Sequence, residues 1–434
     1  MRILKSLVIG AAALALAGCG DNAHLPKSAS YGPNPTLPQP QDALIPFYNV
    51  PSVAGWANSG APTPAPGLSV RAFATQLEHP RWLLVLPNGD VLVAEGDHGT
   101  EWGDKMGYGG YVETLYRRIQ GLFTKSANKI VLLRDTNGDG VAEVKSDFLT
   151  GLNAPIGMAL VNGTLYVANT DSLMAYPYKD GQTRIDGPGR KVTDLPAGDI
   201  DHHWTKNVIA SKDGSKLYVT IGSNSNAGEN GIAAETDRAR IWEVDPATGS
   251  HRVFATGIRN PNGMMWTPDG TLWAVSNERD EIGGDLVPDY LTSVKDGAFY
   301  GWPFSWYGQH VEPRIKPADR RPDLVAKATA PDFAMGTHTA TLGLAWSEGN
   351  TLGFGDGAFV GQHGSWNRRP LNGYRVAFVS FKDGKPVGQP RDVLTGFIKD
   401  DGTVYGRPVD VALDKQGALL VADDAGNAVW RISK

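Results

Sequence analysis

Two adjacent histidines follow an aspartate just before a strongly predicted β-hairpin. Asp201, His202 and His203 stand in the run GDIDHHWTKN, and two apolar strands around an Asp-Gly turn follow them. A neutral imidazole has a pKa near neutrality, so it can accept the proton of a substrate hydroxyl. On an extended chain Asp201 and His203 share one face, so Asp201 could orient the ring of His203. The alternative is an ordinary polar pair on a loop.

A second polar group stands at the start of a later hairpin, where Arg259 and Asn260 precede Pro261. Equivalent positions in successive hairpins of a ring-shaped fold lie around the same end of its central channel. Arg259 and His203 would then meet in a polar pocket that tolerates an anion. Taken alone, a surface arginine followed by a turn-forming Asn-Pro pair is the simpler interpretation.

Acidic residues crowd the segment between residues 277 and 289 and favour a calcium site. The run NERDEIGGDLVPD contains Glu278, Asp280 and Asp289, and Tyr300 follows it in FYGWP. Calcium binds hard oxygen ligands, which carboxylates on a glycine-containing loop supply. A solvated acidic loop is the alternative.

A weaker calcium signal lies in the run LLRDTNGDGVAE. Asp135, Asn137 and Asp139 match the opening of an EF-hand loop, D-x-N-x-D-G. Ser146 stands where the EF-hand requires a glutamate, and no helical pattern flanks the run. The run is therefore no EF-hand, and a calcium site on a β-turn and a plain Asx-rich turn both stay open.

The elements that would position these residues are repeated hairpins. An apolar strand, a turn with glycine, a second apolar strand and a small or acidic residue recur in the ranges 80–97, 155–171, 207–223, 261–280, 342–364 and 408–424. Such long-period repetition is the sequence signature of a β-propeller. We predict an all-β, six-bladed β-propeller with loop and short helical insertions, one of them a helix over 111–123. Five or seven blades stay open, because the copy after Leu342 is weak.

Composition narrows the class of protein. The 434 residues carry 41 basic and 46 acidic side chains without a basic cluster, which argues against nucleic acid as a partner. The sequence lacks a G-x-S-x-G nucleophile elbow, a phosphate loop and zinc-ligand spacing. Serine-hydrolase chemistry is therefore unsupported.

The amino-terminal residues predict a lipoprotein. Arg2 and Lys5 precede an apolar run that ends in Leu-Ala-Gly-Cys, with Cys19 the only cysteine of the chain. This pattern indicates a signal peptide over 1–19 with a bacterial lipobox and lipidation at Cys19. The proline-rich segment 20–67 reads as an extended tether, and the propeller domain would span 68–434. We expect a cell-envelope protein facing the periplasm, with Gly20 favouring the outer membrane over the inner one.

With these residues assembled, the chain resembles the quinoprotein glucose/sorbosone dehydrogenase family over roughly Leu68 to Lys434. It looks closest to the L-sorbosone dehydrogenase branch, which is similar to fungal pyranose dehydrogenase domains. The motifs that carry the resemblance, in order, are HWTKNVIASKDGSKLYVTIGSNSN, GIRNPNGM, NERDEIGGDLVPDYLTSVKDGAFYGWP, GQHGSWNRRPLNGYRV and GRPVDVALDKQGALLVADD.

The resemblance implies a six-bladed propeller that oxidises a sugar or sugar-derived aldehyde with pyrroloquinoline quinone (PQQ) and Ca²⁺. It implies His203 as the catalytic base, with hydride passing to the quinone. The electron acceptor stays open, with a cytochrome and the quinone pool as candidates. The remaining matches are Arg259 and Asn260 at the quinone and substrate, Tyr300 in the calcium-loop segment, and His338 and Arg407 at the quinone.

Three positions depart from the family pattern. The glucose enzymes have an aspartate directly before the base, whereas this chain has His202 there and Asp201 one residue earlier. A quinone-binding lysine is replaced by Trp366 or Asn367, with Arg368 next to it as a candidate cofactor contact. A second arginine after Arg407 is a valine. A non-catalytic propeller that binds a sugar or a protein, and a calcium-dependent lactonase propeller, are the alternative functions.

The lipobox leads to a first prediction. The Cys19→Ser variant should appear in the soluble fraction, because it lacks the thiol that receives the lipid, whereas the wild type should pellet with membranes. Fractionation followed by immunoblotting measures this. A variant that pellets like the wild type would contradict the lipid anchor.

Overall fold

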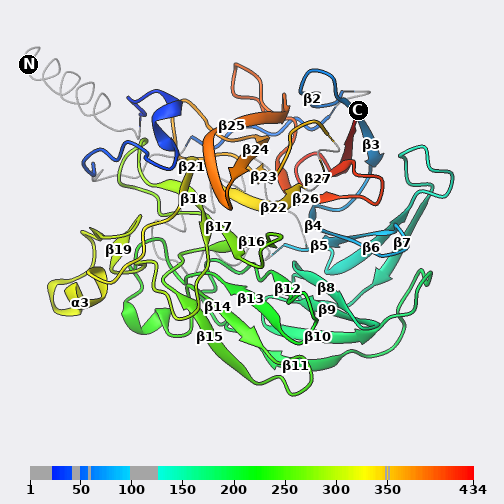
Figure 1. Cartoon of the computed structure of the whole chain (residues 1–434), viewed down its shortest axis with the longest axis horizontal. Helices are drawn as coiled ribbons and strands as arrows, with labels where there is room; N and C mark the ends of the chain where they lie inside the picture. Colours follow the sequence, from blue (N-terminus) through cyan, green and yellow to red (C-terminus); the bar gives the residue numbers. More distant parts are fainter. Residues whose placement is uncertain (1–21, 42–48, 57–59, 98–125, 348, 350–351) are drawn as a thin grey trace, which may run out of the picture.

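The computed structural model describes residues 22–41, 49–56, 60–97, 126–347, 349 and 352–434. Within these residues, six antiparallel sheets of four or five strands form a ring, and a small two-stranded sheet lies beside them (Figure 1). The first strands of neighbouring sheets contact one another around the whole ring. The predicted all-β, six-bladed propeller is confirmed, and the helix predicted over 111–123 lies outside the described residues.

The first three blades follow the chain in simple order from the centre outward. Blade 1 contains β4 (Pro80–Val85), β5 (Val91–Glu95), β6 (Lys129–Arg134) and β7 (Val144–Leu149). Blade 2 contains β8 (Met158–Val161), β9 (Thr164–Ala168), β10 (Ser172–Pro177) and β11 (Arg190–Asp194). Blade 3 contains β12 (Val208–Ala210), β13 (Leu217–Ile221), β14 (Arg240–Val244) and β15 (His251–Thr256).

The other three blades each recruit a strand from the amino-terminal part of the chain. Blade 4 contains β16 (Pro261–Trp266), β17 (Leu272–Ser276), β18 (Pro288–Ser293), β21 (Phe333–Thr337) and β1 (Tyr31–Gly32). Blade 5 contains β22 (Thr341–Ser347), β23 (Gly357–Gln362), β24 (Arg375–Lys382), β25 (Lys385–Thr395) and β2 (Thr63–Pro64). Blade 6 contains β26 (Pro408–Leu413), β27 (Leu419–Asp423), β28 (Ala428–Ser433) and β3 (Ser69–Ala74), so a strand from each end of the propeller domain closes the ring.

Short elements fill the connections between strands. They are η1 (Lys27–Ser30), η3 (Ile232–Glu235), β19 (Ser305–Trp306), β20 (His310–Val311), η4 (Pro317–Asp319) and α3 (Pro322–Val325). Among the described residues, none of the helices has the length and apolar character needed to cross a membrane.

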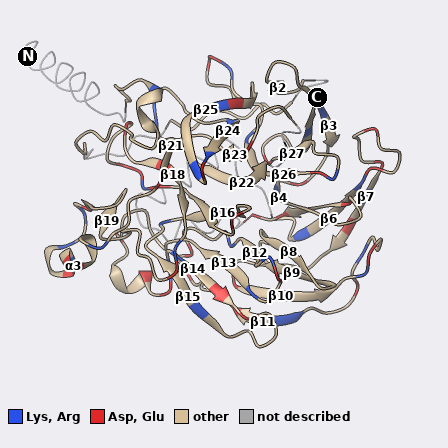
Figure 2. Cartoon of the chain, in the orientation of Figure 1, with Lys and Arg blue, Asp and Glu red and all other residues tan. Residues whose placement is uncertain are grey.

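Burial explains why the second strand of each blade reads as a continuous apolar run. Every residue of β5, β13, β17, β23 and β27 is buried, because neighbouring blades cover both faces of these strands. The outer strands β7 and β15 instead mix exposed and buried residues. Charged residues of both signs are found mainly on outer strands and loops (Figure 2).

The innermost strands approach so closely that glycine is required at two contacts. A Cβ on Gly157 would lie 2.2 Å from the amide nitrogen of Val208 in blade 3. A Cβ on Gly343 in β22 would lie 2.4 Å from the carbonyl oxygen of Val409 in blade 6. Because backbone cannot yield like a side chain, any larger residue would force adjacent blades apart.

The described parts of segment 20–67 differ from the expected free tether. β1 pairs with β21, and β2 pairs with β25. Unpaired edge strands of a blade offer backbone donors and acceptors, which an extended proline-rich chain can fill without helical propensity. The composition predicted an extended conformation, but it could not reveal that the segment would lie on the propeller.

Candidate functional site

The predicted site residues come together because strand direction alternates within each blade. The first strand of a blade begins, and the second strand ends, at the same end of the ring. His203, Arg259 and Arg407 precede first strands, and Asp280 follows a second strand. Gly222 confirms a close contact, because a Cβ there would lie 2.4 Å from Cβ of His203 and 2.8 Å from Oδ1 of Asn260.

His203 is held as one tautomer. Its Nδ1 lies 3.1 Å from the carbonyl oxygen of Ser223 and 2.8 Å from Oγ of Ser223, which itself donates to the carbonyl of Ser225. A carbonyl can only accept, so the hydrogen-bond network assigns the proton to Nδ1 and leaves the lone pair on Nε2. Burial lowers the pKa of His203 well below its usual value, and neighbouring His202 and Arg259 lower it further. The ring is therefore neutral at physiological pH.

The extended chain assumed for Asp201 to His203, which would turn His202 to the opposite face, is wrong. His202 and His203 lie in a bend before β12 begins, and their rings meet edge to face with centroids 4.3 Å apart. Asp201, which has a positive φ of 29°, leads into this bend. The alternation argument fails because it holds only for an extended strand.

Asp201 supports the loop rather than the ring of His203. Its buried carboxylate accepts hydrogen bonds from Arg238 at 2.6 Å and from Thr170 Oγ1 at 2.6 Å, and Nζ of Lys206 lies 3.5 Å away. Lys206 is fully buried, and this burial lowers its pKa to about 8. The predicted orienting role of Asp201 falls to Ser223 instead.

Arg259 is buried and uses most of its donors within the protein. Its guanidinium donates to the carbonyls of Asn226, Asn277 and Glu278 at 2.8–3.2 Å and to Oδ1 of Asn226 at 2.9 Å. Next to it, Oδ1 of Asn260 is buried without a hydrogen-bond partner among the described residues. Of this predicted pair, Asn260 therefore offers the open polar atom.

His338 is paired with Asp280 across blades 4 and 5. Nδ1 of His338 lies 3.0 Å from Asp280 Oδ1, and Nε2 lies 3.0 Å from the carbonyl of Gly283. Although burial opposes ionisation, the hydrogen bond from His338 and the charge of Arg259 hold the pKa of Asp280 at about 2. Both partners of His338 are then acceptors only, so both ring nitrogens donate and the ring is an imidazolium. Asn367 donates to the same oxygen at 2.8 Å, and its own Oδ1 is buried without a partner among the described residues.

The four predicted calcium ligands do not form one cage. Asp289 is buried and accepts hydrogen bonds from the amides of Glu278 and Thr341 at 2.9 and 2.7 Å, while the hydroxyl of Tyr300 donates to the carbonyl of Ser293. Burial raises the pKa of Glu278 to about 7. These acidic residues are close to one another in the sequence, but in the structure their side chains contact separate parts of blade 4.

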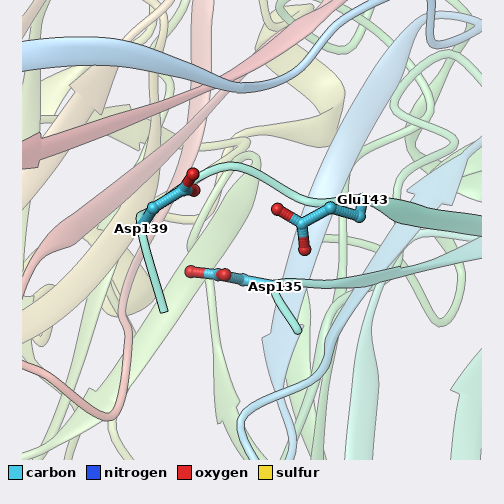
Figure 3. A group of neighbouring side chains, drawn as sticks. All are labelled: Asp135, Asp139 and Glu143. Atoms are coloured by element: carbon cyan, nitrogen blue, oxygen red, sulfur yellow. The ribbon is translucent and has the colours of Figure 1, made fainter. Parts of the chain in front are cut away.

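One acidic group among the described residues does have metal-ligand spacing. Ligand atoms of Asp135, Asp139 and Glu143 all lie within 4.8 Å of one another in the β6–β7 hairpin (Figure 3). Asn137 instead donates to Glu143 at 2.8 Å. Glu143 is the ninth residue of the loop. The comparison with the EF-hand looked for a glutamate at residue twelve and therefore did not identify Glu143. His203 lies at the end of the ring where second strands such as β5 finish. The β6–β7 hairpin lies at the other end, because β6 is antiparallel to β5.

Arg368 is a predicted cofactor contact, but its guanidinium is bonded within the protein. Its guanidinium donates to the carbonyls of Gly284 and Pro370 at 2.8 and 2.6 Å and lies 3.7 Å from Asp285. It therefore ties the loop after β23 to the loop after β17. Arg407, by contrast, keeps a buried Nε without a partner among the described residues.

The site residues predicted from the sequence do not include His363, a further histidine at this end of the channel. Nε2 of His363 lies 2.8 Å from Asp424, and Arg81 pairs with the same carboxylate. Burial lowers the pKa of His363 to about 4, so this ring is also neutral. Arg81 in turn lies over the ring of Trp204, 6.0 Å from its centroid. The position of His363 at the end of a second strand, like that of Asp280, was the available signal.

The arrangement suits a polar, anionic ligand beside a neutral base. Three buried atoms without described partners, on Asn260, Asn367 and Arg407, come from three different blades. A ligand that supplies donors, acceptors and negative charge would satisfy them, whereas an apolar ligand would not.

Comparisons with known proteins agree with this architecture. A family model described as TrAA12-like matches residues 124–289 and 312–434. The chain is 23% identical over 296 residues to a pyrroloquinoline quinone-dependent pyranose dehydrogenase of Coprinopsis cinerea, covering 54% of this chain and 40% of that enzyme. It is 24% identical over 302 residues to an uncharacterized protein of Borreliella burgdorferi, covering 65% of this chain and 76% of that protein.

Two solved structures share the fold. The Trichoderma reesei enzyme of carbohydrate-active family AA12 superposes with a TM-score of 0.69 at 18% identity, covering 91% of this chain and 100% of that one. The PQQ domain of the Coprinopsis cinerea pyranose dehydrogenase gives 0.68 at 18% identity, covering 89% and 100%. At this identity the likeness establishes the propeller fold.

The hairpin cluster leads to a second prediction. If Asp135, Asp139 and Glu143 bind Ca²⁺, millimolar Ca²⁺ should raise the unfolding temperature of the wild type, because a ligand of the folded state stabilises it, by about 2.7 kcal/mol at one hundred times Kd. The Asp139→Ala variant should lose this response. Calorimetry with Ca²⁺ and with Mg²⁺ measures it. An equal response in both proteins would indicate that the hairpin is only a hydrogen-bonded turn.

Proposed function

The chain belongs to the TrAA12-like family, and from that membership and the polar channel we propose that it is a PQQ-dependent oxidoreductase acting on a sugar or a sugar-derived aldehyde. The observation that carries the proposal is the neutral His203, whose Nε2 bonds to none of the described residues, beside the Asn260 oxygen, which also has no partner among them. The name of the Coprinopsis relative, a PQQ-dependent pyranose dehydrogenase, supports the cofactor and the substrate class.

The residues present fit PQQ, which is a planar tricarboxylate. Arg407 and Arg81 supply positive charge near the channel, and the amide oxygens of Asn260 and Asn367 can accept hydrogen bonds from its pyrrole N–H or from a substrate hydroxyl. Bound PQQ would supply a two-electron acceptor for hydride from the substrate carbon. The role of the protein is then to bind both molecules, hold them in contact and remove one proton.

His203 would remove that proton. Nε2 accepts the proton of the substrate hydroxyl while the hydride leaves the same carbon, and Ser223 keeps the ring in place through Nδ1. The imidazolium so formed has Arg259 and His202 as neighbours, both of which disfavour positive charge. The proton therefore leaves the ring readily after the reaction.

Calcium at the quinone stays part of the proposal, supported by the family resemblance and by a calcium structure of the Trichoderma reesei relative. Glu278, Asp280, Asp289 and Tyr300 do not fit a side-chain cage for it, so no step above depends on the ion. Treatment of the PQQ-loaded Asp139→Ala variant with EDTA tests the calcium requirement. This variant is used because it lacks the intact acidic group of the β6–β7 hairpin. Loss of activity restored by Ca²⁺ is expected, and unchanged activity would contradict a calcium requirement at the quinone.

The finer features of the proposal concern substrate and location. We propose an L-sorbosone or aldose type of substrate, because both present a carbon with a hydroxyl or hydrated aldehyde to the base. A lipid anchor at Cys19 would hold the enzyme in the periplasm, most simply at the outer membrane. Its electrons would pass to a cytochrome or the quinone pool. The residues 1–19 that carry the anchor motif lie outside the described part of the chain.

A dye-reduction assay tests the function. Purified protein loaded with PQQ and Ca²⁺ should reduce an artificial electron acceptor with at least one member of a panel of aldoses and sugar-derived aldehydes, and should fail without PQQ. A lactonase would release acid without dye reduction, and a binding protein would do neither. Either of those results with PQQ-saturated protein would overturn the proposal.

Variants of the two adjacent histidines test the base. His203→Ala should bind PQQ and lose about 10²–10⁴-fold in kcat, whereas the matched control His202→Ala should lose far less. Because the pKa of His203 lies well below its usual 6.5, wild-type kcat should hold as pH falls through 6.5 and decline only in more acidic buffer. Steady-state kinetics from pH 4.5 to 8 measures both. An inactive His202→Ala beside an active His203→Ala would assign the base to the other ring.

A further inference from the structure

The amino-terminal segment contacts the loops that carry the candidate site. Amides of Ala23 and Asn49 donate to the carbonyls of Arg369 and Trp366 at 2.9 and 2.7 Å, in the loop that holds Asn367. Gln41 donates to the carbonyl of Ile282 at 2.9 Å, between Asp280 and Gly283. A tether that only spaced the propeller from a membrane would need none of these contacts.

The strongest contact is made by Trp56. Its Nε1 donates to Oδ2 of Asp423 at 2.7 Å, and its ring stacks on Tyr405 with centroids 5.3 Å apart. The ring also meets Phe397 and Trp430 edge to face at 5.7 and 5.3 Å. A Cβ on Gly426 would lie 2.5 Å from the same indole nitrogen, so the chain leaves space for this ring.

Asp423 connects Trp56 to Arg407. Its carboxylate is fully buried and accepts hydrogen bonds on Oδ1 from the amides of Arg407 and Gly426 at 2.7 and 2.8 Å. On Oδ2 it accepts from Trp56 and from Trp430 Nε1 at 3.0 Å. Four donors offset the cost of burying this charge, and burial still raises its pKa to about 6. Removing one donor leaves this buried carboxylate less completely satisfied, so its position and that of the Arg407 amide it holds are less firmly fixed.

Arg407 depends on this anchor for its position. It lies directly before β26, its side chain lies over the ring of Tyr374 with Cζ 5.8 Å from the centroid, and its buried Nε has no described partner. Its amide is held by Asp423, and its carbonyl accepts from the amide of Asp424 at 3.3 Å. The backbone at Arg407 is therefore fixed from both sides by the end of β27.

We propose that Trp56 is a positioning residue for the cofactor site, acting through Asp423 on the backbone of Arg407. The segment before the propeller thus belongs to the binding site rather than to a spacer. This inference rests on the proposed function, because it takes Arg407 as a contact of PQQ.

The test uses the full-length protein and a matched pair of variants. Trp56→Phe keeps an aromatic ring and removes the N–H donor, whereas Val53→Ala removes packing of the same segment against the hydrophobic cluster that contains Val404 and leaves the donor. We expect Trp56→Phe to weaken PQQ binding by about tenfold, the effect of one strong hydrogen bond, and Val53→Ala to leave it unchanged. Titration of the apoprotein with PQQ, followed by fluorescence, measures both.

A double-mutant cycle shows whether Trp56 acts through Arg407. In an Arg407→Gln background, Trp56→Phe should cause no further loss of PQQ affinity, because the side chain it positions is gone. A purely structural role would instead give additive losses. Additivity, or an unchanged affinity of Trp56→Phe itself, would overturn the inference.

A measurement without the cofactor separates this inference from the proposed function. Hydrogen exchange of the apoprotein should be faster at the Arg407 amide in Trp56→Phe than in Val53→Ala. If the wild type does not bind PQQ, the proposed function fails while this exchange difference still tests the Trp56–Asp423–Arg407 connection. If Trp56→Phe does not fold, Asp423→Asn tests the same carboxylate, and an unchanged PQQ affinity of that variant would overturn the inference.

Discussion

The close approach of six innermost strands is the constraint on which the rest of the structure depends. Backbone meets backbone at Gly157 and Gly343, and no side chain separates the blades there. The second strand of a blade is consequently buried on both faces and is mainly apolar, with polar residues such as Glu95 and Asp423 at its end. Polar and charged groups are thereby confined to the strand ends, outer strands and loops. The ring geometry brings ends from separate blades to one point, and the candidate site forms there.

Charges at this end of the channel are buried, and each needs partners to be tolerated. Asp201 has Arg238 and Lys206, Asp280 has His338, and Asp424 has Arg81 and His363. Many of these pairs join two blades or join a loop to a blade. They fix the loops that the strands alone cannot hold, because a loop has no ladder of backbone hydrogen bonds.

The site therefore contains two kinds of polar group. Arg259, Arg368 and Asp201 spend their hydrogen bonds on the protein and hold the loops in place. Asn260, Asn367, Arg407 and Nε2 of His203 instead keep a polar atom that bonds to none of the described residues, and in the proposed function these atoms meet the ligand. Burying an unsatisfied polar atom costs about 1–3 kcal/mol, so such atoms persist where a ligand satisfies them in the working protein. This division separates supporting residues from binding residues more clearly than residue type does.

The sequence by itself was enough to predict the propeller fold. An apolar strand, a turn with glycine and a second apolar strand recur along the chain, and each of these units is recognised from local signals alone. It also determined which residues stand at strand ends, and hence that His203, Arg259 and Arg407 share one end of the channel. Only the tertiary structure decided what each side chain does there. Whether Arg259 faces a ligand or a carbonyl depends on loops from other blades, and the role of Glu143 depends on how tightly a hairpin turns. The same holds for the segment before residue 68. Its composition predicts an extended chain, but the blade edges and the buried carboxylate that receive Trp56 exist only once the ring has closed.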